Sequence, residues 1–134
     1  MAYWRLLIPL TYMAGLFLLS SIPDTDSPST LAEEALLLLP PSWQNLLHIP
    51  LYGGLAISWI WSLSASPLSP RLCMVVGILL TMGWGIIDEI YQATVPGRFG
   101  SLADMGLNQL GAAVAAALIH RTSLVEPKRR EGQP

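Results

Sequence analysis

Three pairs of polar residues in this sequence are each four positions apart, a spacing that puts two side chains on one face of an α-helix. The pairs are His48 with Tyr52, Asp88 with Gln92, and Asp104 with Asn108. Imidazole, phenol, carboxylate and amide groups hold polar ligands through hydrogen bonds, and an imidazole or a carboxylate can also transfer a proton. The available chemistry is therefore ligand binding or acid–base catalysis, provided that the fold brings the pairs together.

Two further charged residues lie close to these pairs. Glu89 follows Asp88 directly but points about 100° away from it on a helix. Arg98 ends a Pro-Gly-Arg turn signal, which can fold its planar guanidinium back over Asp88 or Asp104. Because Asp88 shares its face with Gln92, we expect Asp88 to pair with Arg98 and Glu89 to be free for a ligand or a proton.

The composition predicts that membrane helices position these residues. Hydrophobic residues make up 52% of the 134 residues and charged residues only 12%, about half of the ~25% usual in soluble domains. Four apolar runs approach the ~20 residues that a helix needs to cross a bilayer; they are residues 6–22, 46–63, 72–87 and 105–119. The last two runs reach full length only if Asp88, Glu89 and Asp104 lie at or inside the membrane interface.

The basic residues predict the orientation, because cytoplasmic loops carry an excess of Lys and Arg. Four spans put both termini on one side, and that side holds Arg5, Arg71, Arg121, Lys128, Arg129 and Arg130. We therefore expect a multi-pass protein of the cell membrane with both termini in the cytoplasm. Residues 1–122 would form the transmembrane domain, and residues 123–134 a polar cytoplasmic tail.

A short helix is expected in the first external loop. Thr30 and Glu33 have the spacing of a capping box, and Pro40-Pro41 would stop a helix that begins there. Its leucines, residues 36–39, would lie in the outer leaflet or fold back beside the bundle. The predicted fold class is thus an all-α bundle of four transmembrane helices with a short interfacial helix.

This topology brings the polar residues together in space. At ~1.5 Å per residue, the third helix reaches Asp88 about 26 Å from its inner end, close to the outer edge of the ~30 Å hydrocarbon core. Charged groups inside a span usually face the bundle interior and pair there. The residues expected to meet at the outer end are Asp24, His48, Tyr52, Asp88, Glu89, Gln92, Arg98, Asp104 and Asn108.

The same residues resemble the motif of the VanZ-like family of small bacterial membrane proteins. The similar part runs over about residues 20–111 and includes His48, Tyr52, Asp88, Glu89, Gln92, Pro96, Gly97, Arg98, Asp104, Asn108 and Gly111. The resemblance implies a bacterial cytoplasmic-membrane protein, and the name-giving member is linked to resistance to the glycopeptide teicoplanin. Where the family often carries an Asp-Lys pair before the histidine helix, this sequence has Gln44 and Asn45.

Three functions fit such a cluster. The first is a binding protein of the cell envelope, whose outer pocket holds a lipid headgroup, a wall precursor or a glycopeptide. The second is an intramembrane enzyme acting on lipid-linked substrates, with His48 or Glu89 as general base, although no serine-nucleophile or zinc-protease motif is present. The third is a small packing subunit of a membrane complex, with the cluster as an interhelical lattice. We favour binding, because the polar groups exceed what packing four short helices needs; whether the protein is an enzyme stays open.

The expected partners are membrane lipids and a lipid-linked envelope precursor. A net charge of −2 carries no nucleic-acid signal, and the single cysteine, Cys73, excludes an intrachain disulfide. No cofactor is expected, and the spacing specifies no metal, although His48 with Asp88 and Asp104 would suit a divalent cation. A homo-oligomer or a partner in a membrane complex stays open. Glycines at positions 53, 54, 83, 85, 106 and 111 are expected to pack helices closely.

Overall fold

Residues 3–24, 30–31, 34–35 and 38–122 are described by the computed structural model, and this part of the chain contains helices and no strands. The elements in chain order are η1 (Tyr3–Leu6), α1 (Leu7–Ser20), α3 (Pro41–Leu46), α4 (His48–Leu63), α5 (Pro70–Gln92) and α6 (Leu102–Thr122). The expected tail, residues 123–134, lies outside the described residues, as do Glu33 and Leu36 of the expected interfacial helix.

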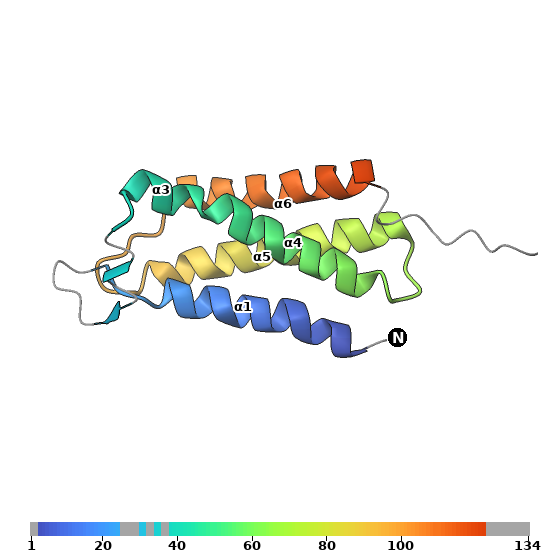
Figure 1. Cartoon of the computed structure of the whole chain (residues 1–134), viewed down its shortest axis with the longest axis horizontal. Helices are drawn as coiled ribbons and strands as arrows, with labels where there is room; N and C mark the ends of the chain where they lie inside the picture. The colour runs from blue at the N-terminus through green and yellow to red at the C-terminus, as the bar shows by residue number, and fades with distance from the viewer. Residues whose placement is uncertain (1–2, 25–29, 32–33, 36–37, 123–134) are drawn as a thin grey trace, which may run out of the picture.

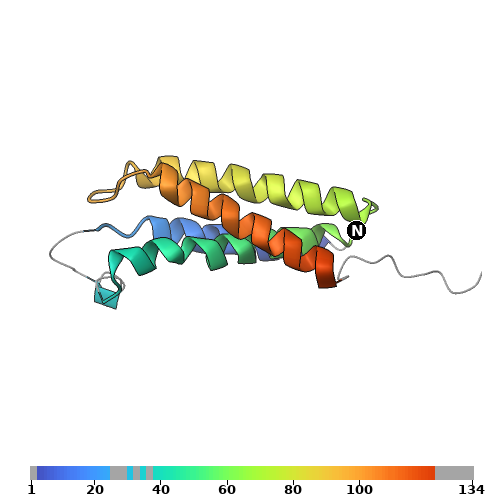
Figure 2. The same ribbon diagram turned by 90° about the horizontal axis from the view of Figure 1, so that it is seen from above.

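The long helices lie side by side along the long axis of the molecule (Figures 1 and 2). In Figure 1, α4 crosses the middle of the bundle between α1 and α6, and it contacts α1, α5 and α6. The N-terminus and the end of α6 lie at the same end of the bundle. The opposite end holds the ends of α1 and α5 and the starts of α4 and α6.

In the described part of the chain, four helical segments are long and apolar enough to cross a membrane, the number predicted from the sequence. They are Tyr3–Ser20, Ser42–Leu63, Pro70–Gln92 and Leu102–Arg121. Asp88, Glu89 and Asp104 all fall inside these segments. Large apolar side chains such as Leu79 and Leu118 are exposed on the outside of the bundle, as helices that face lipid require.

Local signals explain where two helices begin. The Ser69 hydroxyl accepts the backbone N–H of Leu72 at 3.3 Å, and Pro70 occupies the first turn of α5, where its missing N–H costs no hydrogen bond. Proline also stands in the first turn of α3. Pro41, interpreted from the sequence only as the end of a preceding helix, therefore starts the segment that continues through Leu47 into α4.

Small residues let α4 and α6 approach closely. A Cβ on Gly53 would lie 3.3 Å from the carbonyl oxygen of Gly111, and a Cβ on Gly111 would overlap the carbonyl oxygen of Ile49. The contact continues through a buried alanine cluster formed by Ala56, Ala112 and Ala115. The predicted role in packing is wrong for Gly83 and Gly106, where a Cβ would meet nothing within 4 Å.

Candidate functional site

A cavity of about 400 Å³ lies at the end of the bundle where α1 and α5 end and α4 and α6 begin. Most of the predicted cluster lines it, namely Asp24, His48, Tyr52, Asp88, Gln92, Arg98 and Asp104. Gln44 and Asn45 line it as well.

Asp88 is the centre of the polar network. Its side chain is 2% exposed, and its Oδ2 accepts hydrogen bonds from the Ser20 hydroxyl at 2.8 Å, the Tyr52 hydroxyl at 2.7 Å and the Gln92 amide at 3.3 Å. Gln92 also donates to the Ser20 oxygen at 3.1 Å. The other carboxylate oxygen, Oδ1, is buried and accepts nothing from the described residues.

Ser20 is a member of this network that sequence reasoning missed. It lies in the last turn of α1, beside the charged residues of α5, and is buried. The only signal in the sequence is that the first apolar run ends on two serines. Serine at the end of an apolar span is too common to predict a contact with a residue 68 positions later in the chain.

The predicted pairing of Asp88 with Arg98 is wrong. The Arg98 guanidinium donates from Nε to the carbonyl oxygen of Ile22 at 2.8 Å, whereas the bonds to Asp88 come from helices α1, α4 and α5. The reason is the position of the turn that carries Arg98, which packs against the chain leaving α1. There the Asp24 N–H donates to the Pro96 carbonyl at 3.2 Å.

This turn depends on Gly97. The Arg98 N–H donates to the Val95 carbonyl at 3.1 Å, Pro96 occupies the second position, and Gly97 has φ +77°, as in a type II turn. A Cβ on Gly97 would also overlap the carbonyl oxygen of Asp24. The Pro-Gly-Arg sequence thus joins the α5–α6 connection to the segment after α1.

Glu89 supports the start of α6 and is absent from the cavity lining. It is 2% exposed, and its Oε1 accepts the Ser101 N–H at 2.6 Å. The Ser101 hydroxyl in turn accepts the N–H groups of Ala103 and Asp104 at 3.1 and 3.3 Å, as an N-cap does. The expected roles of the two carboxylates are therefore reversed: Asp88, expected to pair with Arg98, lines the cavity, and Glu89, expected to be free for a ligand, accepts a backbone N–H.

His48 is oriented by Asn108 across the α4–α6 interface. Its Nδ1 lies 2.7 Å from Asn108 Oδ1, and because an amide oxygen only accepts, Nδ1 carries the proton and Nε2 of a neutral ring is an acceptor. The His48 and Tyr52 rings are nearly parallel, at 8°. A Cβ on Gly85 would lie 3.1 Å from Tyr52 and 3.2 Å from Asn108, so a side chain at this position would crowd both residues where they cross α5.

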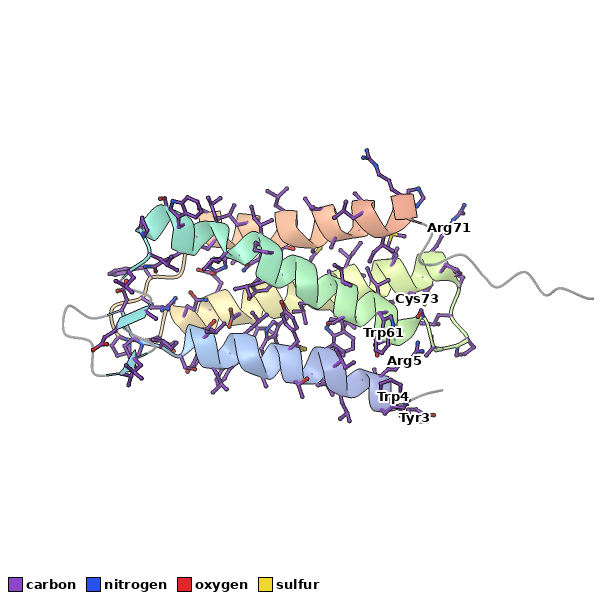
Figure 3. All side chains as sticks on the ribbon, viewed as in Figure 1. Tyr3, Trp4, Arg5, Trp61, Arg71 and Cys73 are labelled. Atoms are coloured by element: carbon purple, nitrogen blue, oxygen red, sulfur yellow. The ribbon has the colours of Figure 1, made fainter. Side chains whose placement is uncertain are left out.

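The opposite end of the bundle carries an aromatic and basic group, which Figure 3 labels. The Arg5 guanidinium carbon lies 4.4 Å from the ring centre of Trp61 and 5.8 Å from that of Trp4. Cys73 is buried there, and its thiol donates to the Leu63 carbonyl at 3.3 Å. Trp and Arg side chains of this kind are common at a membrane–water interface.

Neither a metal centre nor a known relative explains the cavity. Among the described residues, no three His, Cys, Asp or Glu side chains converge as a metal site requires, so the donor set suggested by His48, Asp88 and Asp104 is not assembled. No family model, no curated protein and no solved structure matches the chain. The hydrogen bonds, burial and charges of the cavity therefore have to indicate its function.

Proposed function

We propose that this chain is a cell-membrane protein that binds the polar headgroup of an envelope ligand in the cavity described above. The observation that carries the proposal is Asp88, a buried carboxylate that lines the cavity and has one oxygen without a donor among the described residues. The ligand classes are those expected from the sequence: a lipid headgroup, a wall precursor or a glycopeptide.

Two unpartnered oxygens belong to carboxylates that line the cavity, and they support a ligand site there. In folded proteins, buried polar groups are nearly always paired, because each unmade hydrogen bond costs about 1–3 kcal/mol. Asp88 Oδ1 and Asp104 Oδ1 are both buried and unpartnered among the described residues, and both side chains line the cavity. A polar ligand with N–H or O–H groups would satisfy them once the two carboxylates rotate toward the cavity.

The size and lining of the cavity favour a headgroup. A volume of about 400 Å³ lies in the lower part of the roughly 300–1,000 Å³ range of pockets that hold drug-sized ligands. It suits a headgroup or the end of a wall precursor better than a whole glycopeptide. Leu16, Leu19 and Leu51 line the same cavity and would lie beside the alkyl part of an amphiphile.

The proposal includes an orientation, with the cavity at the outer face and both termini in the cytoplasm. Arg5, Arg71 and Arg121 belong to the end of the bundle that holds the N-terminus, and Arg98 belongs to the cavity end. This asymmetry supports a cytoplasmic N-terminus. The resemblance to the VanZ-like family adds a role in tolerance of glycopeptides to the proposal.

His48 supports a second candidate function, that of an intramembrane enzyme on lipid-linked substrates. Asn108 fixes the imidazole so that Nε2 is the acceptor, and His48 lines the cavity. An oriented acceptor nitrogen beside a bound headgroup is what a general base requires. If this candidate is right, His48→Gln keeps headgroup binding and abolishes turnover of a lipid-linked substrate.

The test of the binding function uses Arg98, with Arg71 as its control. Purified protein in detergent is titrated by calorimetry with dihexanoyl phosphatidylglycerol, phosphatidylethanolamine and phosphatidylcholine. We expect one-to-one binding of at least one probe. Arg98→Ala and Arg98→Lys should both weaken it by about tenfold or more, because a lysine ammonium reproduces neither the Nε bond to Ile22 nor a two-pronged phosphate contact.

Arg71 is exposed at the opposite end of the bundle, so Arg71→Ala should leave the binding unchanged. The binding function is refuted if no probe saturates, or if Arg71→Ala weakens binding as much as Arg98→Ala. In cells, the proposed role predicts that expression of the protein raises teicoplanin tolerance and that Arg98→Ala at matched expression does not.

A further inference from the structure

The charges that line the cavity do not match a purely anionic ligand. Among the residues that the structure describes, three carboxylates, those of Asp24, Asp88 and Asp104, share the lining with one arginine, Arg98. A phosphate that reached Arg98 would also approach these carboxylates. A ligand that carries a cation of its own would pair with one of these carboxylates while its phosphate meets Arg98.

We propose that the site takes a zwitterionic lipid headgroup in which a primary ammonium stands next to a phosphate, as in phosphoethanolamine. In this arrangement Asp88 receives the ammonium and Arg98 receives the phosphate. The inference rests on the proposed binding function and specifies the chemical class of its ligand.

The ammonium half of the proposal follows from the partners of Asp88. All three donors to its Oδ2 are neutral groups, the hydroxyls of Ser20 and Tyr52 and the amide of Gln92. Arg98, the arginine named in the lining, donates from Nε to the carbonyl oxygen of Ile22 instead. A carboxylate that is 2% exposed therefore has no counter-charge bound to it among the described residues, which is costly in a low-dielectric interior.

A primary ammonium supplies what this carboxylate lacks. It has a full positive charge and three N–H donors, and Oδ1 accepts nothing from the described residues. Asp104 Oδ1, also buried and unpartnered among them, can accept a second N–H. A quaternary ammonium has the charge but no N–H, and a glycerol headgroup has hydroxyl donors but no charge, so neither satisfies Asp88 fully.

The phosphate half follows from the geometry of Arg98. Its Nε is bound to Ile22, and none of the hydrogen bonds among the described residues uses its Nη groups. Holding Nε fixes the plane of the guanidinium, and a pre-oriented fork suits a phosphate. Leu16, Leu19 and Leu51 continue the lining, which favours a lipid over free phosphoethanolamine as the source of the headgroup.

The experiment compares three dihexanoyl lipids that differ only in the headgroup. Phosphatidylethanolamine has an ammonium with N–H donors, phosphatidylcholine has the same charge without N–H donors, and phosphatidylglycerol has no ammonium. Purified full-length protein should bind the ethanolamine lipid at least about tenfold more tightly than either of the others. Free O-phosphorylethanolamine should bind more weakly than the lipid, since it cannot use the apolar lining.

The key variant is Asp88→Asn. An asparagine keeps the shape of the side chain and one oxygen for Ser20, Tyr52 and Gln92, but it removes the charge and puts an NH₂ donor in place of Oδ1. The preference for the ethanolamine lipid should fall to about the level of phosphatidylcholine. The matched control is Glu89→Gln, which removes a neighbouring carboxylate of equal burial outside the cavity lining and should keep the preference.

The outcomes separate this inference from the binding function itself. If phosphatidylglycerol or phosphatidylcholine binds as tightly as the ethanolamine lipid, while binding still depends on Arg98, the zwitterionic ligand is refuted and the binding site stands. If no lipid binds, both fail. A preference that survives Asp88→Asn, or one that Glu89→Gln removes equally, also refutes the inference.

A further ligand and a replacement variant complete the test. Equal affinity for free O-phosphorylethanolamine refutes a lipid as the source of the headgroup. Should Asp88→Asn fail to give folded protein, Asp104→Asn replaces it, because its Oδ1 is the second proposed acceptor. An unchanged preference in folded Asp104→Asn then refutes the proposal.

Discussion

Replacing Tyr52 by phenylalanine tests whether Asp88 organises the polar end of the bundle. Tyr52 is 1% exposed, and its hydroxyl donates to Asp88 Oδ2 at 2.7 Å. Hydrogen bonds to charged groups contribute about 1.5–3 kcal/mol. Because Ser20 and Gln92 continue to donate to the same oxygen, we expect Tyr52→Phe to lower the free energy of unfolding by an amount in the lower half of that range.

The matched control is Tyr91→Phe, in the last turn of α5 at the same end of the bundle. The Tyr91 hydroxyl lies 2.9 Å from the Ser21 hydroxyl, a neutral and only partly buried partner, and its ring stacks on Phe17 at 4.4 Å between centres. The ring and its stacking remain in phenylalanine. Neutral hydrogen bonds contribute about 0.5–1.5 kcal/mol, so this variant should be the less destabilised of the two.

Both variants are compared with the wild type by reversible unfolding in mixed detergent micelles without added lipid, monitored by circular dichroism. The difference between the two losses isolates the charge and burial of the acceptor, because the same atom is removed in each. Equal losses, or a larger loss in Tyr91→Phe, would mean that Asp88 is not held as a charged acceptor by Tyr52. Asp88 would then not be the centre of the polar network at the cavity.

The remaining predictions concern packing and orientation. Gly111→Ala should destabilise the bundle by about 1–3 kcal/mol, because the added Cβ overlaps a carbonyl oxygen of α4. Gly106→Ala should not destabilise it, because a Cβ there meets nothing within 4 Å. Both are measured by the same unfolding assay, and equal effects would contradict close packing of α4 against α6. A cysteine at Phe99, which is 87% exposed, should react with an impermeant maleimide added to intact cells, and a cysteine at Pro67 should not. The reverse labelling would place the termini outside. The native Cys73 is buried and should not react with the maleimide in either strain.

The sequence by itself determined the helical class, the four candidate spans and most of the residues at the cavity. Apolar runs of nearly bilayer length predict spans without any tertiary information, because water is absent from the hydrocarbon core and every backbone group must pair inside the segment. Alternating directions of the spans put His48, Asp88 and Asp104 at one end, and four-residue spacing put their partners on the same faces. Depth and helical periodicity are local properties, so the sequence is enough to predict them.

Only the tertiary structure decided which of these residues touch. Asp88 and Glu89 differ by a rotation of about 100°, and the sequence does not say which of the two directions points to α1 and α4. That rotation depends on how α5 packs, for example on the close approach of Gly77 in α5 to Ile60 in α4. It turns Asp88 toward Ser20 and Tyr52 and leaves Glu89 to accept a backbone N–H at the start of α6. The partner of Arg98 could likewise not be predicted from the sequence. Its guanidinium binds a backbone carbonyl of a segment more than seventy residues earlier, and a backbone carbonyl contributes nothing to the side-chain pattern.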